Sequence, residues 1–134
     1  DFSFDEENDI VWEDYTSIIF HKIDRDNEYV EYNLKAKEIH HLKCQEIRVI
    51  DDSDELIVMI RKNGQWGVFK YVGVDFENAE FYGFKEIIPI QYDKISGNGY
   101  YSYAKYTSKD LYGYQETFED VYDQDGNLIM TVEL

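Results

Sequence analysis

The sequence contains little cysteine and no long apolar run, and each shortage excludes a class of protein. Cys44 is the only cysteine among 134 residues, so no intrachain disulfide can form and a disulfide-stapled fold is excluded. No apolar run approaches the roughly 20 residues that a membrane-spanning helix needs. No signal peptide is recognisable either. We therefore expect no membrane insertion.

The expected location follows from the same observations. A lone thiol favours a reducing compartment, so the cytoplasm is expected. The chain begins with Asp1 and not with methionine. A surface or secreted location is expected instead if an N-terminal signal has been removed.

Basic side chains are absent from both ends of the chain. Residues 1–20 and 110–134 each contain seven acids and no Lys or Arg, whereas residues 21–109 contain fifteen acids and thirteen bases. Such ends repel nucleic acid phosphates and anionic lipids, and they attract a basic protein. We therefore expect a protein partner, which the charge predicts to be basic, and no nucleic acid. Solubility and protection of exposed ends explain the same charge without a partner.

The residues that are present predict a single all-β domain. Hydrophobic residues make up 43% and aromatic residues 17%, which excludes a disordered polymer, and 134 residues are enough for one core. The apolar runs are rich in Tyr, Val, Ile, Phe and Thr, as strands are. Asn63-Gly64 and Asp125-Gly126 are dipeptides that accept positive φ at both central positions of a type I′ hairpin turn.

Short patterns recur at an offset of 48 residues, and a repeat would set the architecture. Residues 37–39 (Lys-Glu-Ile) recur as residues 85–87, and Ile47 aligns with Ile95. These patterns predict three degenerate β-hairpin repeat units, each of three short strands, stacked as a short solenoid or sandwich-like body. The expected units are about 15–47, 54–95 and 99–134, in a single domain 10–134 that follows a frayed acidic tail, residues 1–9.

Trp66-Gly67 marks the best-preserved unit. The indole is expected to fill space between layers, and the glycine lets the adjacent backbone approach. Trp66→Ala is therefore expected to cost roughly 3–5 kcal/mol, as large core truncations do.

Residues 62–70 and 86–95 resemble the bacterial WG-repeat family, also called KWG repeats. Repeats of that family run from a lysine and a turn through Trp-Gly and two apolar residues to a second turn, Ile-Ile-Pro and Tyr-Asp. Here Tyr29 and Tyr112 replace the tryptophan in the other two units, and an insert at 71–84 replaces the usual short turn. The resemblance implies β-hairpin repeats and a non-enzymatic interaction module, in a family that often occurs in surface proteins and around bacterial toxin systems.

The histidines and the cysteine do not predict a metal site. His40, His41 and Cys44 form the only cluster of these residue types, and His21 is the only other histidine. A zinc site needs about four converging ligands, whereas adjacent histidines on a strand point to opposite faces. We therefore expect a mixed strand with a buried Cys44 and no metal.

No motif predicts catalysis or a cofactor. The run 123–127 resembles part of a calcium loop, but the first and last loop positions would be Val121 and Val132, where an EF-hand has acids. A hairpin turn explains the run better. The chain has no Gly-x-Ser-x-Gly elbow, no phosphate-binding glycine loop and no carboxylate pair that stands out. We expect neither an enzyme nor a small-molecule ligand.

Tyrosines gather in the last third of the chain, where eight of the thirteen lie between Tyr92 and Tyr122. We expect Tyr101 and Tyr103 to share a face of one strand, and Tyr112 and Tyr114 a face of the next. Exposed tyrosines would form a platform for a protein or a sugar. Cross-strand aromatic pairs that only stabilise a narrow repeat are the alternative.

The predicted function is a non-enzymatic protein-interaction module with an acidic, tyrosine-rich surface. Two alternatives stay open: an immunity protein that neutralises a basic toxin by blocking its active site, and a carbohydrate-binding module of the cell surface. The insert and the third unit are expected to form the binding side. The predicted partner-binding residues are Phe76, Phe81, Tyr82, Tyr101, Tyr103, Tyr112, Tyr114, Glu119 and Asp120.

Overall fold

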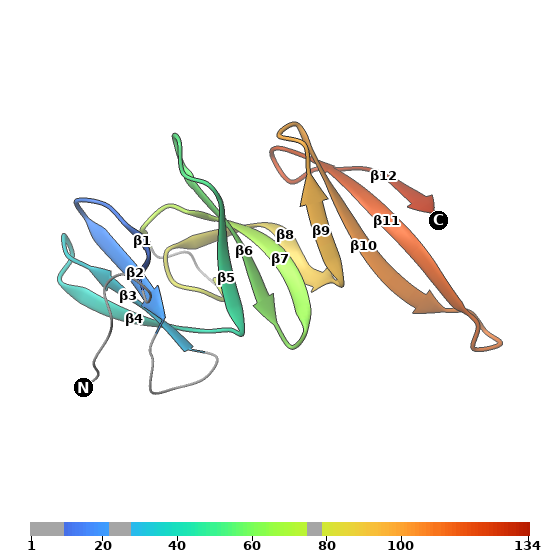
Figure 1. The fold of residues 1–134 in the computed structure, drawn as a ribbon, viewed down its shortest axis with the longest axis horizontal. Coiled ribbons are helices and arrows are strands. Elements are labelled where there is room, and N and C mark those ends of the chain that lie inside the picture. The colour runs from blue at the N-terminus through green and yellow to red at the C-terminus, as the bar shows by residue number, and fades with distance from the viewer. Residues whose placement is uncertain (1–9, 22–27, 75–78) are drawn as a thin grey trace.

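A computed structural model describes residues 10–21, 28–74 and 79–134, and these form an all-β fold with no helix (Figure 1). The strands form three antiparallel four-stranded sheets, which we name A, B and C in chain order. The strands of sheet A are β1 (Ile10–Glu13), β2 (Ser17–His21), β3 (Glu28–Asn33) and β4 (Glu38–Lys43). Those of sheet B are β5 (Glu46–Asp51), β6 (Leu56–Lys62), β7 (Gln65–Tyr71) and β8 (Phe84–Tyr92). Those of sheet C are β9 (Lys94–Gly97), β10 (Tyr101–Lys109), β11 (Gln115–Asp123) and β12 (Leu128–Glu133).

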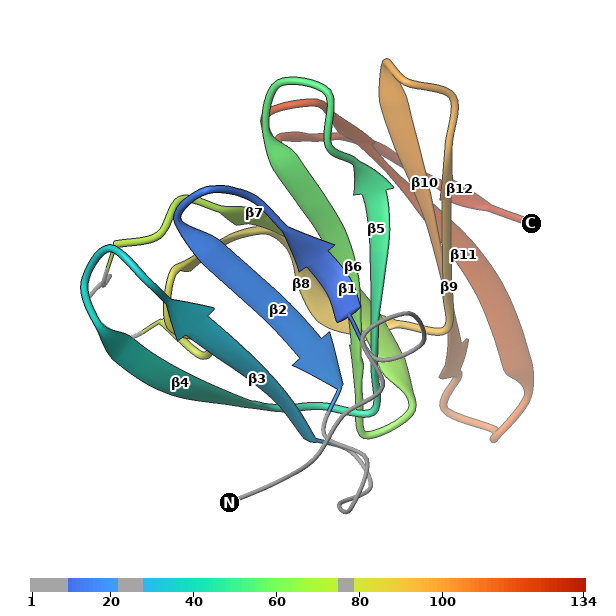
Figure 2. The ribbon, with the colours of Figure 1, turned by 60° about the vertical axis from the view of Figure 1, so that its left-hand side comes forward.

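Sheet B lies between the other two sheets (Figure 2). Successive side chains along its strands point into two separate cores. Val58 on β6 and Phe69 on β7 belong to a core shared with sheet A, together with Ile19 and Leu42. Successive residues of a strand point to opposite faces, so Val68, next to Phe69, belongs instead to the core between sheets B and C. That second core is completed by Ile88, Tyr92, Ile95, Ala104 and Tyr122.

Each sheet has four strands, whereas the sequence predicts three strands in each unit. In sheets B and C the difference arises at Ile47 and Ile95, which were expected to end a unit but lie on β5 and β9, the first strands of these sheets. In sheet A it arises at β1, which precedes residue 15, the expected start of the first unit. Only two residues separate β4 from β5, and only Asp93 separates β8 from β9. These links contain no glycine or proline, so no local turn signal marks where one sheet ends and the next begins.

The two predicted type I′ turns have different outcomes. Asn63 and Gly64 join β6 to β7 with φ of 54° and 79°, so a two-residue turn of positive φ is confirmed there. In the second turn only Gly126 has positive φ, and the prediction is wrong. The Asp123 amide donates to the Asn127 carbonyl at 3.0 Å, which closes a longer loop with a left-handed glycine. Asp123 Oδ1 accepts hydrogen bonds from the amides of Asp125 and Asn127, and these favour the longer form.

Candidate interaction surface on the C-terminal sheet

The tip of the β10–β11 hairpin, residues 110–114, carries the two most exposed large apolar side chains of sheet C, Leu111 and Tyr112, and we name it the tyrosine tip. Nine consecutive residue pairs join β10 to β11, so the hairpin extends far from sheet B (Figure 1). Leu111, Tyr112 and Tyr114 are 99%, 86% and 72% exposed. The tip therefore presents three large side chains to solvent at the outer end of the molecule.

The tyrosine tip is held in one backbone conformation by Asp110. Its Oδ1 accepts hydrogen bonds from the amides of Tyr112 at 2.9 Å and Tyr114 at 3.0 Å. The Asp110 amide donates to the Tyr114 carbonyl at 3.0 Å, and Gly113 supplies the positive φ. Tyr112 and Tyr114 thus lie in the turn before β11, and not on a shared strand face as the sequence predicted. A turn ordered before binding loses less entropy when a partner arrives.

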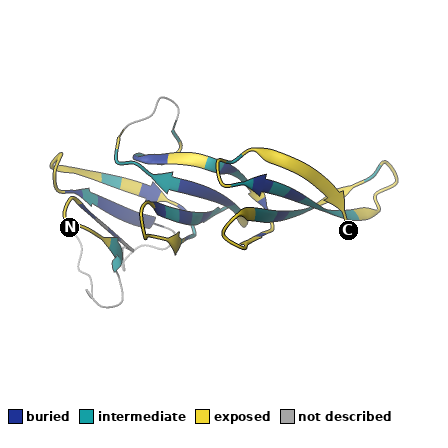
Figure 3. Cartoon of the chain, turned by 90° about the horizontal axis from the view of Figure 1, so that it is seen from above, coloured by how far each residue is buried: buried dark blue, intermediate teal, exposed yellow. Residues whose placement is uncertain are grey.

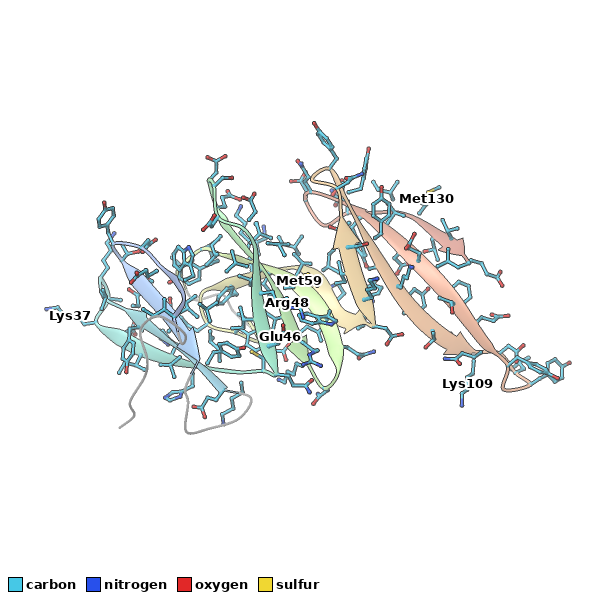
Figure 4. All side chains as sticks on the ribbon, viewed as in Figure 1. Lys37, Glu46, Arg48, Met59, Lys109 and Met130 are labelled. Carbon is cyan, nitrogen blue, oxygen red and sulfur yellow. The ribbon has the colours of Figure 1, made fainter. Side chains whose placement is uncertain are left out.

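The face of sheet C turned away from sheet B, its outer face, is partly apolar. The strand register places Tyr103 on β10 opposite Val121 on β11, and Val121 opposite Met130 on β12. Tyr101 lies on the same face as Tyr103 because side chains alternate along a strand. Every residue of β12 is exposed (Figure 3). Met130 and Lys109, labelled in Figure 4, lie near the two ends of this sheet.

Glu119 and Asp120 were predicted together but point to opposite faces of β11. Glu119 pairs with Lys105 in the register and lies on the outer face. The Asp120 side chain is buried, where it accepts hydrogen bonds from the Tyr92 hydroxyl at 2.7 Å and from Thr131 Oγ1 at 2.6 Å. Asp120 therefore joins sheets B and C and is removed from the predicted partner surface.

The predicted residues of the insert do not join this surface. Phe81 is only 3% exposed and packs against Phe69 in the core between sheets A and B, with ring centroids 5.4 Å apart. Because it is buried, Phe81 cannot belong to the predicted partner surface. Tyr82 stacks on His40 of sheet A, with ring centroids 3.4 Å apart. Sheet B separates both residues from sheet C. Phe76 lies outside the described residues.

His40, His41 and Cys44 have separate surroundings. His41 Nδ1 lies 2.6 Å from Glu28 Oε1, whereas His40 faces the Tyr82 ring. Cys44 is buried, as expected, and its surroundings raise the pKa of the thiol to about 12, chiefly through burial. Within the described residues, no group of three or more His, Cys, Asp or Glu side chains is arranged to hold a metal ion.

The apolar part of β12 was missed in the sequence. Met130 and Val132 are exposed, and they pair in the register with Val121 and Glu119 of β11. Residues 128–132 look like an ordinary buried strand because they contain no charged side chain. Only their exposure in the structure, at the edge strand of sheet C, shows that nothing in the described chain covers them.

No family model, no curated protein and no solved structure matches this chain. The resemblance to WG repeats therefore stays a prediction. No helix of the described residues is long and apolar enough to cross a membrane.

Proposed function

We propose that this chain is a non-enzymatic protein-interaction module that presents an acidic, tyrosine-rich surface on sheet C. The tyrosine tip is the observation that carries the proposal. Tyr112 and Tyr114 are exposed to solvent on a turn that Asp110 orders, and neither ring belongs to a core formed by the described residues. Rigid aromatic side chains supply large contact areas at low entropic cost, and they are frequent among the residues that dominate binding energy.

The charge of the same region indicates what kind of partner surface fits. Residues 110–134 contain seven acids and no Lys or Arg. A partner with neutral or basic groups around an apolar centre would complement them, whereas an acidic partner would be repelled. The outer face adds Tyr101, Met130 and Val132 as exposed apolar contacts beside Glu119.

The test compares two sets of exposed tyrosines. Tyr112→Ser combined with Tyr114→Ser removes both rings of the tip, whereas Tyr15→Ser removes a fully exposed ring from the β1–β2 turn. Wild type, the double variant and the control are immobilised and exposed to the same native lysate at low salt. The proposal expects a protein that the wild type and Tyr15→Ser retain and that the double variant loses. Equal retention of the protein by all three chains would rule out the tyrosine tip as the binding site.

An immunity protein against a basic toxin is the second candidate, and the absence of basic side chains from residues 110–134 favours it. Acidic inhibitors associate quickly with basic active sites, and the association rate falls steeply with salt. The retained partner would then be a basic enzyme that loses activity in the complex. A salt-independent association rate would count against this candidate. Glycan-array binding that the double variant loses would instead support the carbohydrate-binding alternative.

A further inference from the structure

A groove of about 790 Å³ lies between sheets B and C, away from the tyrosine tip. Sheet C packs on sheet B mainly through β9 on β7 and β10 on β8. The face of sheet B that sheet C covers continues past the edge of sheet C. There, Ile57 and Met59 of β6 line the groove. Met59 is labelled in Figure 4. Both side chains are half-buried, so the floor of the groove is apolar and accessible.

The rim of the groove is acidic on both sides. On one side it is lined by Asp51 at the end of β5 and by Asp54 and Glu55 of the β5–β6 turn, and on the other by Asp123 at the end of β11 and Asp125 of the β11–β12 turn. The two turns project from the same side of the molecule (Figure 1). Carboxylates on both sides of an apolar floor attract a cation that carries an apolar stem.

Two of these carboxylates are held in the charged form. Hydrogen bonds from the Ser53 amide and hydroxyl keep the pKa of Asp51 below its usual range. Hydrogen bonds from the Asn127 amide and side chain do the same for the pKa of Asp123. The rim therefore stays negative in mildly acidic solution.

Two lysines also line the groove, but they do not balance the five acids. Lys70 Nζ forms an ion pair with Glu55 Oε1 at 2.9 Å, which neutralises one carboxylate. Lys85 is the second. Three carboxylates remain in excess, so the groove complements positive charge.

The free edge of β9 indicates that the occupant is an extended chain. β9 contributes Ile95, Ser96 and Gly97 to the groove. It pairs with β10 on one side and with no described strand on the other. The backbone groups along a free edge can pair with an extended peptide, and the alternate side chains of that peptide then enter the neighbouring pockets.

We propose that this groove binds an extended peptide segment of a partner protein, in which apolar residues alternate with Lys or Arg. The segment pairs with the edge of β9, its apolar side chains lie on Ile57 and Met59, and its basic side chains reach the carboxylates of the two turns. This inference rests on the proposed function in taking a protein as the partner, but it concerns a region away from the tyrosine tip, although Tyr101 of the outer face also lines the groove. The tip and the β11–β12 turn lie at opposite ends of β11, about 26 Å apart at roughly 3.3 Å per residue.

A synthetic seven-residue peptide that alternates lysine and valine tests the groove in the full chain. Binding is followed by nuclear magnetic resonance, and amide exchange is measured for β9 with and without the peptide. The proposal expects saturable binding, shifts at Ile57 and Met59, and slower exchange of β9 amides. No saturable binding, or protection only outside β9, would overturn it. Equal binding of a peptide with glutamate in place of lysine, or full displacement by equimolar spermine, would also overturn it.

Two double variants separate local charge from total charge. Asp54→Lys with Asp125→Lys reverses one exposed acid in each turn, and Glu38→Lys with Glu133→Lys makes the same change in net charge away from the groove. The first pair should weaken peptide binding at least tenfold and the second less than twofold. Equal weakening by both pairs would show that only total charge matters and would overturn the proposal. The rings of Tyr112 and Tyr114 are outside the groove, so the double serine variant of the tip should bind this peptide normally even if it loses its partner.

Discussion

The Tyr92 hydroxyl donates a hydrogen bond of 2.7 Å to Asp120 Oδ2 and so joins β8 of sheet B to β11 of sheet C. Tyr92 is fully buried, and burial raises the pKa of its hydroxyl, which keeps the proton that the bond requires. The Tyr122 hydroxyl contacts the Tyr92 hydroxyl, and Thr131 Oγ1 donates to the other oxygen of Asp120. The contact between the two sheets therefore includes a buried polar network as well as apolar packing.

Tyr92→Phe should lower the free energy of unfolding by about 1–3 kcal/mol, because it leaves a buried carboxylate oxygen without its donor. Tyr106→Phe is the control. Its ring lies 5.8 Å from that of Tyr92, and its hydroxyl makes no hydrogen bond within the described residues, so we expect a change within about 0.5 kcal/mol. Urea unfolding of the three proteins measures both effects. Similar losses in the two variants would contradict the role of the hydrogen bond to Asp120.

Gly113 and Gly126 occupy equivalent turn positions but have different neighbours. Their φ angles are 85° and 83°, so an alanine at either site costs about 1–2 kcal/mol of backbone strain. A Cβ at Gly113 would meet nothing within 4 Å, whereas a Cβ at Gly126 would overlap the Ile87 carbonyl oxygen of sheet B. Gly126→Ala should therefore destabilise the fold by at least about 1 kcal/mol more than Gly113→Ala, measured by urea unfolding. Equal costs would show that the turn does not touch β8.

Trp66→Ala tests the prediction that the sequence makes for this residue. The indole is half-buried against the core between sheets B and C, and the guanidinium carbons of Arg48 and Arg61 lie 5.0 Å and 5.6 Å from its ring centroid. Partial burial lowers the expected cost from roughly 3–5 kcal/mol to about 1–3 kcal/mol. Arg48→Ala alone should cost about 0.5–1 kcal/mol. A loss above about 4 kcal/mol for Trp66→Ala would show that the indole acts as a core residue.

The all-β class could be predicted from the sequence because its signals are local. Asn63-Gly64 identifies its turn, since few other dipeptides accept positive φ at both positions. The boundaries of the sheets could not be predicted in the same way. Whether β5 pairs with β4 or starts a new sheet depends on long-range pairing, because the link between them has no turn residue.

The candidate site was predictable in residue type more than in position. The tyrosines of the third unit could be identified from their number, and Tyr101, Tyr112 and Tyr114 are exposed. The burial of Phe81 and Asp120 could not be identified, because it depends on packing between sheets. The groove was also missed, since its two acidic rims are more than 60 residues apart in the sequence.

Cys44 should be unreactive in the folded protein. Burial raises its pKa to about 12, so almost no thiolate is present at neutral pH, and the side chain is also closed to solvent. Alkylation by iodoacetamide at pH 8 should be at least a hundredfold slower in buffer than in 8 M urea. Mass spectrometry of timed samples measures both rates. Comparable rates would show that the end of β4 opens readily.

Glu31 should make the stability of the fold depend on pH. Its side chain is fully buried, the Tyr71 hydroxyl donates to Oε2, and Oε1 has no hydrogen-bond partner within the described residues. Burial raises the pKa of this carboxyl above its usual range, against the opposing effects of the Tyr71 hydrogen bond and of His40. The folded state therefore binds the proton more tightly than the unfolded state. The contribution of protonated Glu31 to stability is fully present below the pKa of the carboxyl in the unfolded chain, about 4.3. It is lost as the pH rises through the pKa of the same carboxyl in the folded chain.

Glu31→Gln cannot ionise, so it should avoid this loss while it keeps an oxygen that accepts the Tyr71 hydrogen bond. The stability of the variant relative to wild type should rise between pH 4 and pH 8. Urea unfolding across that range measures the difference at each pH, and the comparison cancels the titration of the other acids. Glu119→Gln makes the same substitution on the outer face of sheet C and controls for the loss of one carboxyl group. A constant difference between Glu31→Gln and wild type would mean that Glu31 titrates alike in the folded and unfolded chains.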